Sequence, residues 1–156
     1  MANEDLTRQL QAIQTYFEKT VECFDDADGE FAPKEGMFTV AQQIAHAAQT
    51  VEWFLEGAFR PQGFSMDFAE HEEEVRAITS LEDALAWWRT ACQEALTSIA
   101  GSAPEAWDDP IRGKLMEGMP RRTILGGIND HTAHHRGALA VYARLLGREP
   151  AMPYGA

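Results

Sequence analysis

The sequence predicts an all-α protein, a four-helix bundle, and three observations lead to this prediction. Four segments of about 20 residues carry apolar residues at steps of three and four, the spacing that lines one face of a helix. No segment shows the alternation of apolar and polar residues that is typical of a strand. Residues that favour turns, mainly Asp, Gly and Pro, gather where these segments end. Four helices that each have one apolar stripe can cover one another as a bundle.

The first two predicted helices are separated by a long loop. The first covers residues 6–24 and ends in the Asp- and Gly-rich start of the loop 25–38. The second covers residues 40–59, with Thr39 as its predicted N-cap, and ends before Pro61. A connection of this length allows the chain to cross the bundle instead of forming a simple hairpin.

The other two predicted helices lie in the second half of the chain. The third covers residues 80–100 and opens with Ser80-Leu81-Glu82-Asp83, which has the form of a capping box. The fourth opens near Pro120 or Arg121 and ends at Gly147. A short acidic helix is expected over residues 68–78, and residues 101–119 form a second long loop.

Length and charge limit the classes of function. The 156 residues are enough for one domain with a substantial core, so we expect a single domain over residues 1–156. The formal net charge of −12 repels phosphate backbones and anionic lipid surfaces, which argues against nucleic acid and membranes as partners. The acidic start of the chain predicts no signal peptide, and no apolar run reaches the roughly 20 residues of a membrane span. We therefore expect a cytoplasmic protein in which Cys23 and Cys92 are reduced.

The most informative motif is His131-Thr132-Ala133-His134-His135-Arg136-Gly137 in the fourth predicted helix. His131 and His135 are four residues apart, which stacks their imidazoles on one helix face and suits two ligands of one metal ion. Both continue the apolar stripe of this helix, so they are expected to point into the bundle. The alternative is a pair of core histidines that bond to backbone carbonyls or water.

A third ligand has to come from another helix, and His46 is the obvious candidate. It falls at the edge of the apolar stripe of the second helix, a place where a histidine can also be a simple boundary residue. His71 lies among glutamates on an expected solvated face, and His134 is out of phase with the pair. A carboxylate of Glu52 or Glu94 is an alternative third ligand.

Three histidines on two helices leave coordination positions open, as in a catalytic site. Imidazole ligands suit a divalent metal ion, and we expect Zn or Ni before Cu or Fe(II). Such an ion polarises carbonyls and lowers the pKa of a bound water or thiol.

The chain resembles the DinB/YfiT-like superfamily. The resemblance rests on residues 131–139 and 142–147, on the Pro-rich end at Tyr154-Gly155, and on His46 followed by Glu52-Trp53-Phe54. It implies a four-helix bundle of up-down-down-up topology, often a homodimer, with His46, His131 and His135 as metal ligands.

One position departs from the family pattern, which usually has Gln after His-Arg-Gly where this chain has Ala138. If that Gln supports the site by hydrogen bonding, another group must replace it here. Arg136 fits the motif, and we expect it to form a structural ion pair across the bundle.

The resemblance implies a metal-dependent enzyme that acts on a small-molecule substrate. Thiol-dependent S-transferases are among the characterised relatives, so the leading hypothesis is a transferase with a low-molecular-weight thiol as co-substrate, in which the bound thiolate attacks an electrophile. The alternatives are a metal-dependent hydrolase, and a metal-binding stress-response protein without catalysis.

Overall fold

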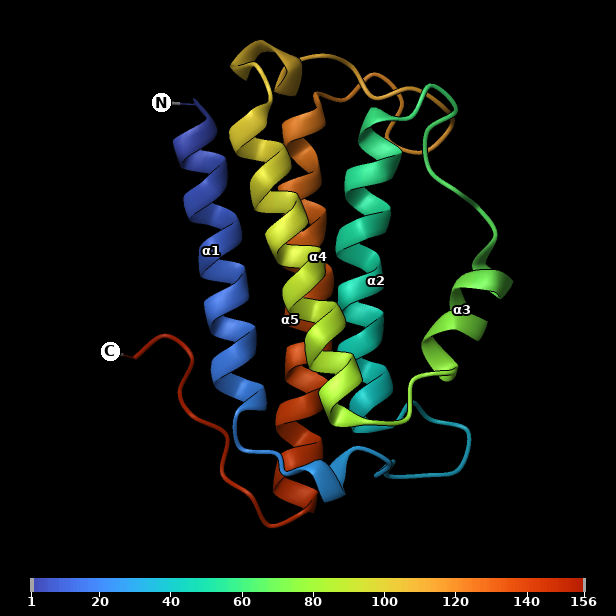
Figure 1. Cartoon of the computed structure of the whole chain (residues 1–156), viewed down its shortest axis with the longest axis vertical. Helices are drawn as coiled ribbons and strands as arrows, with labels where there is room; N and C mark the ends of the chain where they lie inside the picture. Colours follow the sequence, from blue (N-terminus) through green and yellow to red (C-terminus); the bar gives the residue numbers. More distant parts are fainter. Residues whose placement is uncertain (1, 156) are drawn as a thin grey trace.

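The computed structural model describes residues 2–155, and these residues form α-helices and short 3₁₀ turns without any β-strand. Four long helices build the body of the molecule (Figure 1). They are α1 (Ala2–Val21), α2 (Val40–Phe59), α4 (Leu81–Gly101) and α5 (Ile124–Leu145). A shorter helix, α3 (Phe68–Arg76), lies in the connection between α2 and α4. The prediction of an all-α four-helix bundle is confirmed.

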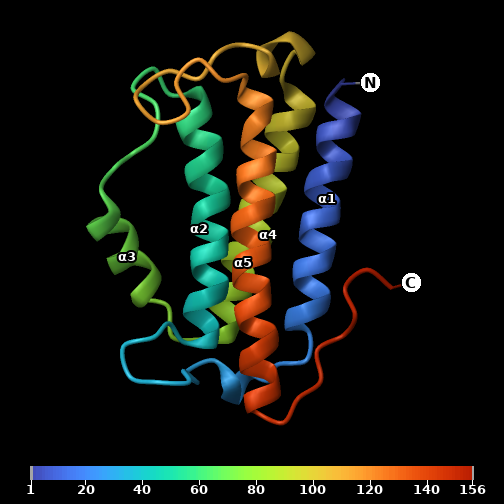
Figure 2. The same cartoon turned by 180° about the vertical axis from the view of Figure 1, so that it is seen from behind.

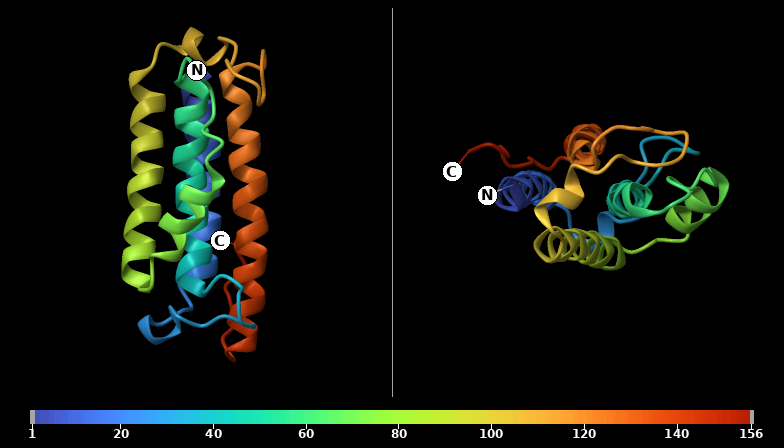
Figure 3. Two further views of the ribbon diagram at one scale, coloured as in Figure 1. Left: turned by 90° about the vertical axis from the view of Figure 1, so that its right-hand side faces the viewer. Right: turned by 90° about the horizontal axis from the view of Figure 1, so that it is seen from above.

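The four long helices form a closed square in which each helix packs against two others. α2 packs against α4 and α5, and α1 packs against the same two helices, so α1 and α2 are diagonally opposite (Figure 3, right). α1 and α5 run in one direction and α2 and α4 in the other (Figures 1 and 2). In chain order this is the up-down-down-up topology. The crossover that contains α3 is long because α2 and α4 are parallel neighbours and the chain must return along the bundle.

Local sequence signals set the starts of α2 and α4. Thr39 Oγ1 accepts from the backbone N–H of Gln42 at 3.1 Å, and Gln42 Oε1 accepts from the N–H of Thr39 at 3.0 Å. At α4, Ser80 Oγ accepts from the N–H of Asp83 at 3.0 Å, which is one half of the capping box that the sequence indicates. Caps of this kind are worth about 1 kcal/mol each, because they satisfy N–H groups that the helix leaves free.

The ends of the first and last helices differ from the prediction. α1 begins at Ala2 and ends at Val21 instead of residue 24, and the chain then turns through a 3₁₀ segment at Asp26–Asp28. The early start has a physical reason, since acidic residues in the first turn favour a helix N-terminus although they carry no apolar stripe. α5 is preceded by a 3₁₀ turn at Arg121–Thr123 and ends at Leu145, just before Gly147 with its positive φ.

The core is continuous along the bundle axis and is formed by the predicted stripes. Trp88 of α4 is fully buried and stacks on Phe17 of α1, with ring centroids 4.2 Å apart. Phe17, Ile44 and Leu139 have no measurable exposure. Both cysteines are free, and Cys92 is buried in this core. Across residues 2–155, no helix has both the length and the apolar character that crossing a bilayer requires.

Candidate metal centre

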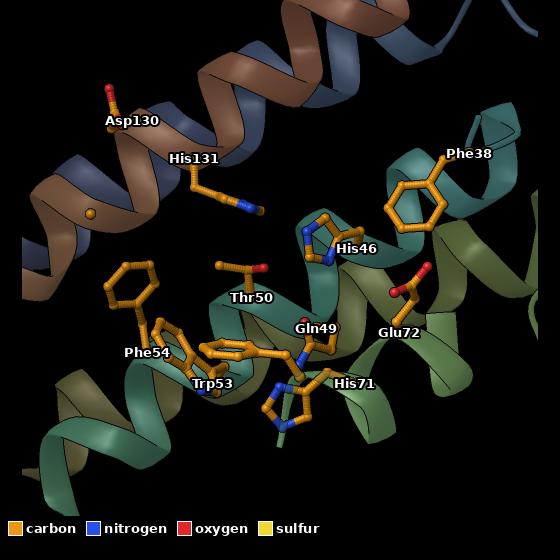
Figure 4. Close-up of a pocket in the computed structure, with 12 residues that line it drawn as sticks. Phe38, His46, Gln49, Thr50, Trp53, Phe54, His71, Glu72, Asp130 and His131 are labelled. Carbon is orange, nitrogen blue, oxygen red and sulfur yellow. The ribbon is translucent and has the colours of Figure 1, made fainter. Parts of the chain in front are cut away.

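Three histidines from two antiparallel helices meet between α2 and α5. His46 comes from α2, and His131 and His135 come from consecutive turns of α5. Each ring offers one nitrogen, and these three nitrogens lie within 4.8 Å of one another. His135 is buried and the other two are half-buried. Figure 4 shows the rings of His46 and His131 pointing toward each other across the gap between the helices.

The spacing within this three-histidine cluster fits a tetrahedral metal ion. Nitrogens bound to one zinc ion at 2.0–2.1 Å lie roughly 3.3 Å apart. Nε2 of His131 and Nε2 of His135 are 3.2 Å apart. Two ring nitrogens that face each other cannot both act as acceptors unless a proton or a cation lies between them. A shared ion would satisfy both lone pairs, and His46 supplies the third nitrogen of the group.

A buried hydrogen-bond chain fixes which nitrogen of His135 faces this cluster. The Tyr142 hydroxyl donates to the Phe38 carbonyl at 2.9 Å, so its oxygen is free to accept from Nε2 of Gln43 at 3.2 Å. The amide oxygen of Gln43 therefore faces His135 and accepts from its Nδ1–H. The ring must then present the lone pair of Nε2 to the cluster, which is the form that binds a metal.

Burial keeps these rings neutral. Burial, together with a smaller effect of the neighbouring histidines, lowers the pKa of His135 from 6.5 to about 3 and that of His131 from 6.5 to about 4. Burial also lowers the pKa of His46, against a smaller opposite effect of the Gln49 side chain. Neutral imidazole is the form that coordinates metal ions, so the cluster is ready for binding at neutral pH without losing a proton.

A cavity of about 580 Å³ adjoins the cluster, between α2, α3 and α5. Its lining includes His46 and His131, so an ion held by the three rings has one side open to the cavity. We call this cavity the pocket. Four of the other lining residues are Phe or Trp, and the remaining walls are mainly polar. These residues are Phe38, Gln49, Thr50, Trp53, Phe54, Phe68, His71, Glu72, Gly127 and Asp130 (Figure 4).

The carboxylates considered as alternative ligands lie elsewhere. Glu52 accepts a hydrogen bond from Nε1 of Trp87 at 2.8 Å and lines a neighbouring groove between α2 and α3, outside the three-histidine cluster. Burial raises the pKa of this carboxyl, and the Trp87 bond opposes the shift. Glu94 lines a groove between α1 and α4. Among the described residues, the only group that could hold an ion consists of the three histidines.

His71 and His134 occupy different surroundings. His134 is exposed, as its phase on the helix predicts. His71 lies in acidic surroundings as expected, since it lines a groove with Glu70 and Glu74, but its side chain is half-buried and also lines the pocket. The cause is the crossover between α2 and α4, which lays α3 against α2 beside the pocket. The periodicity of α3 alone contains no signal for this placement.

Two further expectations concern the motif of α5. Arg136 forms no ion pair among the described residues; its guanidinium instead donates to the Tyr154 hydroxyl at 2.8 Å and lies 5.1 Å from that ring. The predicted ion pair is therefore wrong, and Arg136 holds the C-terminal segment against the bundle. At position 138, alanine stands where the family usually has Gln, and the cluster is supported by Gln43 instead. The sequence analysis did not identify Gln43, because its role depends on a partner 92 residues away.

Comparisons with known proteins agree with this architecture. Among solved structures the chain is similar to one described as "YfiT from Bacillus subtilis is a probable metal-dependent hydrolase with an unusual four-helix bundle topology". The two share 15% identity at a TM-score of 0.70, over 94% of this chain and 89% of that one, a likeness that shows a common fold. No curated protein sequence matches the chain. The sequence model of the DinB superfamily matches residues 9–139, so the chain belongs to the DinB superfamily.

Proposed function

We propose that this protein is a metal-dependent enzyme that acts on a small molecule in the pocket, most simply as a hydrolase. The observation that carries the proposal is the position of the cluster, since two of its three histidines also line the pocket. His46, His131 and His135 would hold a divalent ion, for which Zn or Ni is the first expectation. Bound there, the ion supplies Lewis-acid chemistry and a water of lowered pKa.

The chain's own groups have distinct parts in this proposal. His46, His131 and His135 would bind the metal ion. Gln43 keeps the His135 ring in the tautomer that presents the lone pair of Nε2 to the cluster. The aromatic wall of the pocket excludes water from the apolar part of the substrate. Gln49 and Thr50, which Figure 4 shows beside His46, offer polar groups that can orient a carbonyl next to the cluster.

Two considerations favour hydrolysis. Hydrolysis needs no second organic substrate, and the YfiT structure of similar fold is described as a probable metal-dependent hydrolase. The second candidate is the thiol-dependent S-transferase of the sequence analysis. Its support is the volume of the pocket, about 580 Å³, which is enough for a thiol beside an electrophile. A homodimer and a cytoplasmic location remain predictions.

Metal content tests the first half of the proposal. Inductively coupled plasma mass spectrometry should find about one equivalent of metal per chain in tag-free protein. We expect this metal to be lost in His46→Ala and in His135→Ala. His134→Ala is the matched control, because this exposed neighbour should leave the metal in place. If the native chain binds neither Zn nor Ni on reconstitution, the enzyme proposal is wrong.

The reaction is tested with the cobalt-substituted protein. A thiolate-to-metal charge-transfer band on addition of a low-molecular-weight thiol, with turnover of an electrophile, would favour the transferase. Hydrolysis of ester or amide substrates without any thiol, and loss of that activity in His135→Ala, would favour the hydrolase. A bound metal ion without either activity would leave the non-catalytic alternative, in which the ion only braces α2 against α5.

A further inference from the structure

The pocket beside the three-histidine cluster has a rigid aromatic wall. Trp53 lies in its centre, with ring centroids 5.1 Å from Phe54 and 6.4 Å from Phe68. Nε1 of Trp53 donates to the carbonyl of Ser65 at 2.7 Å, which fixes the indole plane. Phe54 fits because residue 127 is glycine, since a Cβ there would lie 2.5 Å from Cζ of Phe54. A wall of this kind is suited to an aromatic or bulky apolar body.

The charged side chains that line this pocket have one sign. Its described lining contains two carboxylates, Glu72 and Asp130, and neither Lys nor Arg. Next to the lining, Arg76 pairs with Glu72 at 2.8 Å and lies 4.8 Å over the ring of Phe38. The positive charge of Arg76 is thus already matched by Glu72.

A second groove continues this acidic character next to the pocket. It shares Gln49, Trp53 and His71 with the pocket, and four glutamates line it: Glu52, Glu56, Glu70 and Glu74. Its only cation, Arg60, pairs with Glu56 at 2.8 Å. The rim where pocket and groove meet is therefore a region of negative potential, in a chain whose net charge is already −12.

We infer that the substrate has an aromatic or bulky apolar body and carries a protonated amine at the end that faces this rim. The inference rests on the proposed function, because it names the substrate class of the same site. The reacting group lies at the histidine cluster, the apolar body lies along Trp53 and Phe54, and the ammonium group lies near Glu72. An ammonium group at the rim gains from the carboxylates.

The charge of the pocket also limits which reactants can bind. A co-substrate or substrate that carries carboxylates would find no described Lys or Arg side chain in the pocket to bind them. Its entry would also bring like charges together at the rim. An anionic thiol is therefore disfavoured, whereas a neutral or cationic reactant is not.

The test compares three ligands with the same body: 4-phenylbutylamine, 4-phenylbutanol and 4-phenylbutyrate. Their affinities are measured by titration calorimetry at pH 7.5 and low salt, with the full chain free of metal so that the carboxylate cannot bind an ion directly. We expect the amine to bind about tenfold more tightly than the carboxylate, with the alcohol between them. The preference should weaken at 0.5 M salt, because the rim is exposed to solvent.

Three variants locate the effect. Glu72→Gln should reverse or abolish the preference for the amine, because it removes one carboxylate and releases Arg76. Glu22→Gln changes the net charge equally, lies outside the pocket and should preserve the preference. Gly127→Ala should lower the affinity for all three ligands, because the added Cβ crowds Phe54.

Two results would overturn the inference: a carboxylate that binds as tightly as the amine, or amine binding that Glu72→Gln and Gly127→Ala leave unchanged. Neither result depends on metal, so a failure here is distinguishable from a failure of the metal-content experiment.

Discussion

The amide oxygen of Gln43 on α2 accepts a hydrogen bond from Nδ1 of His135 on α5, across the interface between the two helices. Gln43 is one turn before His46 on the same helix, so a single segment of α2 provides one proposed ligand and orients another. The Tyr142 hydroxyl in turn fixes the amide. The three-histidine cluster is therefore held in place by groups that are not themselves proposed ligands.

Loss of the Gln43 side chain should weaken metal binding. We expect Gln43→Ala to lower zinc affinity about 10- to 100-fold, because His135 loses the acceptor that fixes its tautomer. Tyr142→Phe should have a smaller effect in the same direction, since the amide keeps its contact with His135. Competition with a chromophoric chelator measures both. Gln93→Ala, on the exposed face of α4, is the matched control; equal zinc affinity in Gln43→Ala and this control would contradict the assignment.

The stability of the metal-free protein should depend on pH through the same rings. The pKa values of His135 and His131 fall from 6.5 to about 3 and about 4 in the folded chain because of burial. Below pH 6.5 the unfolded chain therefore binds more protons than the folded chain. The contribution of these rings to the free energy of unfolding is complete above pH 6.5 and is lost as the pH falls toward 3.

Urea unfolding at a series of pH values checks this dependence. The double variant His131→Gln/His135→Gln should lose less stability than the native chain between pH 6.5 and 4. Excess zinc should also protect the native chain in this range, and it should not protect the double variant. A pH dependence identical in the two metal-free proteins would show that other groups cause the acid sensitivity.

Adjacent glycines in α5 should respond differently to alanine. A Cβ at residue 126 meets nothing within 4 Å, whereas a Cβ at residue 127 would overlap the ring of Phe54. Gly126→Ala should therefore raise the free energy of unfolding by up to about 1 kcal/mol, the ordinary gain in a helix. Gly127→Ala should gain less than this or lose stability, because Phe54 must move into the pocket. Urea unfolding of the two variants compares them directly, and equal gains would show that Phe54 moves without cost.

The two neighbouring tryptophans of α4 should differ in the same kind of experiment. Trp88 is fully buried against Phe17, so Trp88→Ala should lower the free energy of unfolding by about 3–5 kcal/mol. Trp87 is half-buried and donates to Glu52, so Trp87→Ala should lower it by about 1–3 kcal/mol. Phe17→Leu, which removes the ring that stacks on Trp88, gives a second measurement of how much this contact contributes to the free energy of unfolding. A larger loss for Trp87→Ala than for Trp88→Ala would contradict this description of the core.

The amino-acid sequence determined those features that depend on local periodicity and on chemistry close along the chain. The stripes of the four long helices, the cap at Thr39 and the turn-forming residues between helices led to the four-helix bundle. The four-residue spacing placed His131 and His135 on one face of α5, and the need for another imidazole pointed to His46. These signals survive in the sequence because each depends on helix geometry or on ligand chemistry.

The tertiary structure decided how distant segments meet. Gln43 faces His135 because α2 packs against α5, and His71 lines the pocket because the crossover through α3 folds back along α2. Glu52 turns away from the cluster toward Trp87, and Arg136 binds Tyr154 instead of a carboxylate. Helical periodicity gives only the direction of a side chain around its own axis. Its partner is fixed by the rotation and height of the neighbouring helix, which are set by packing of the whole core.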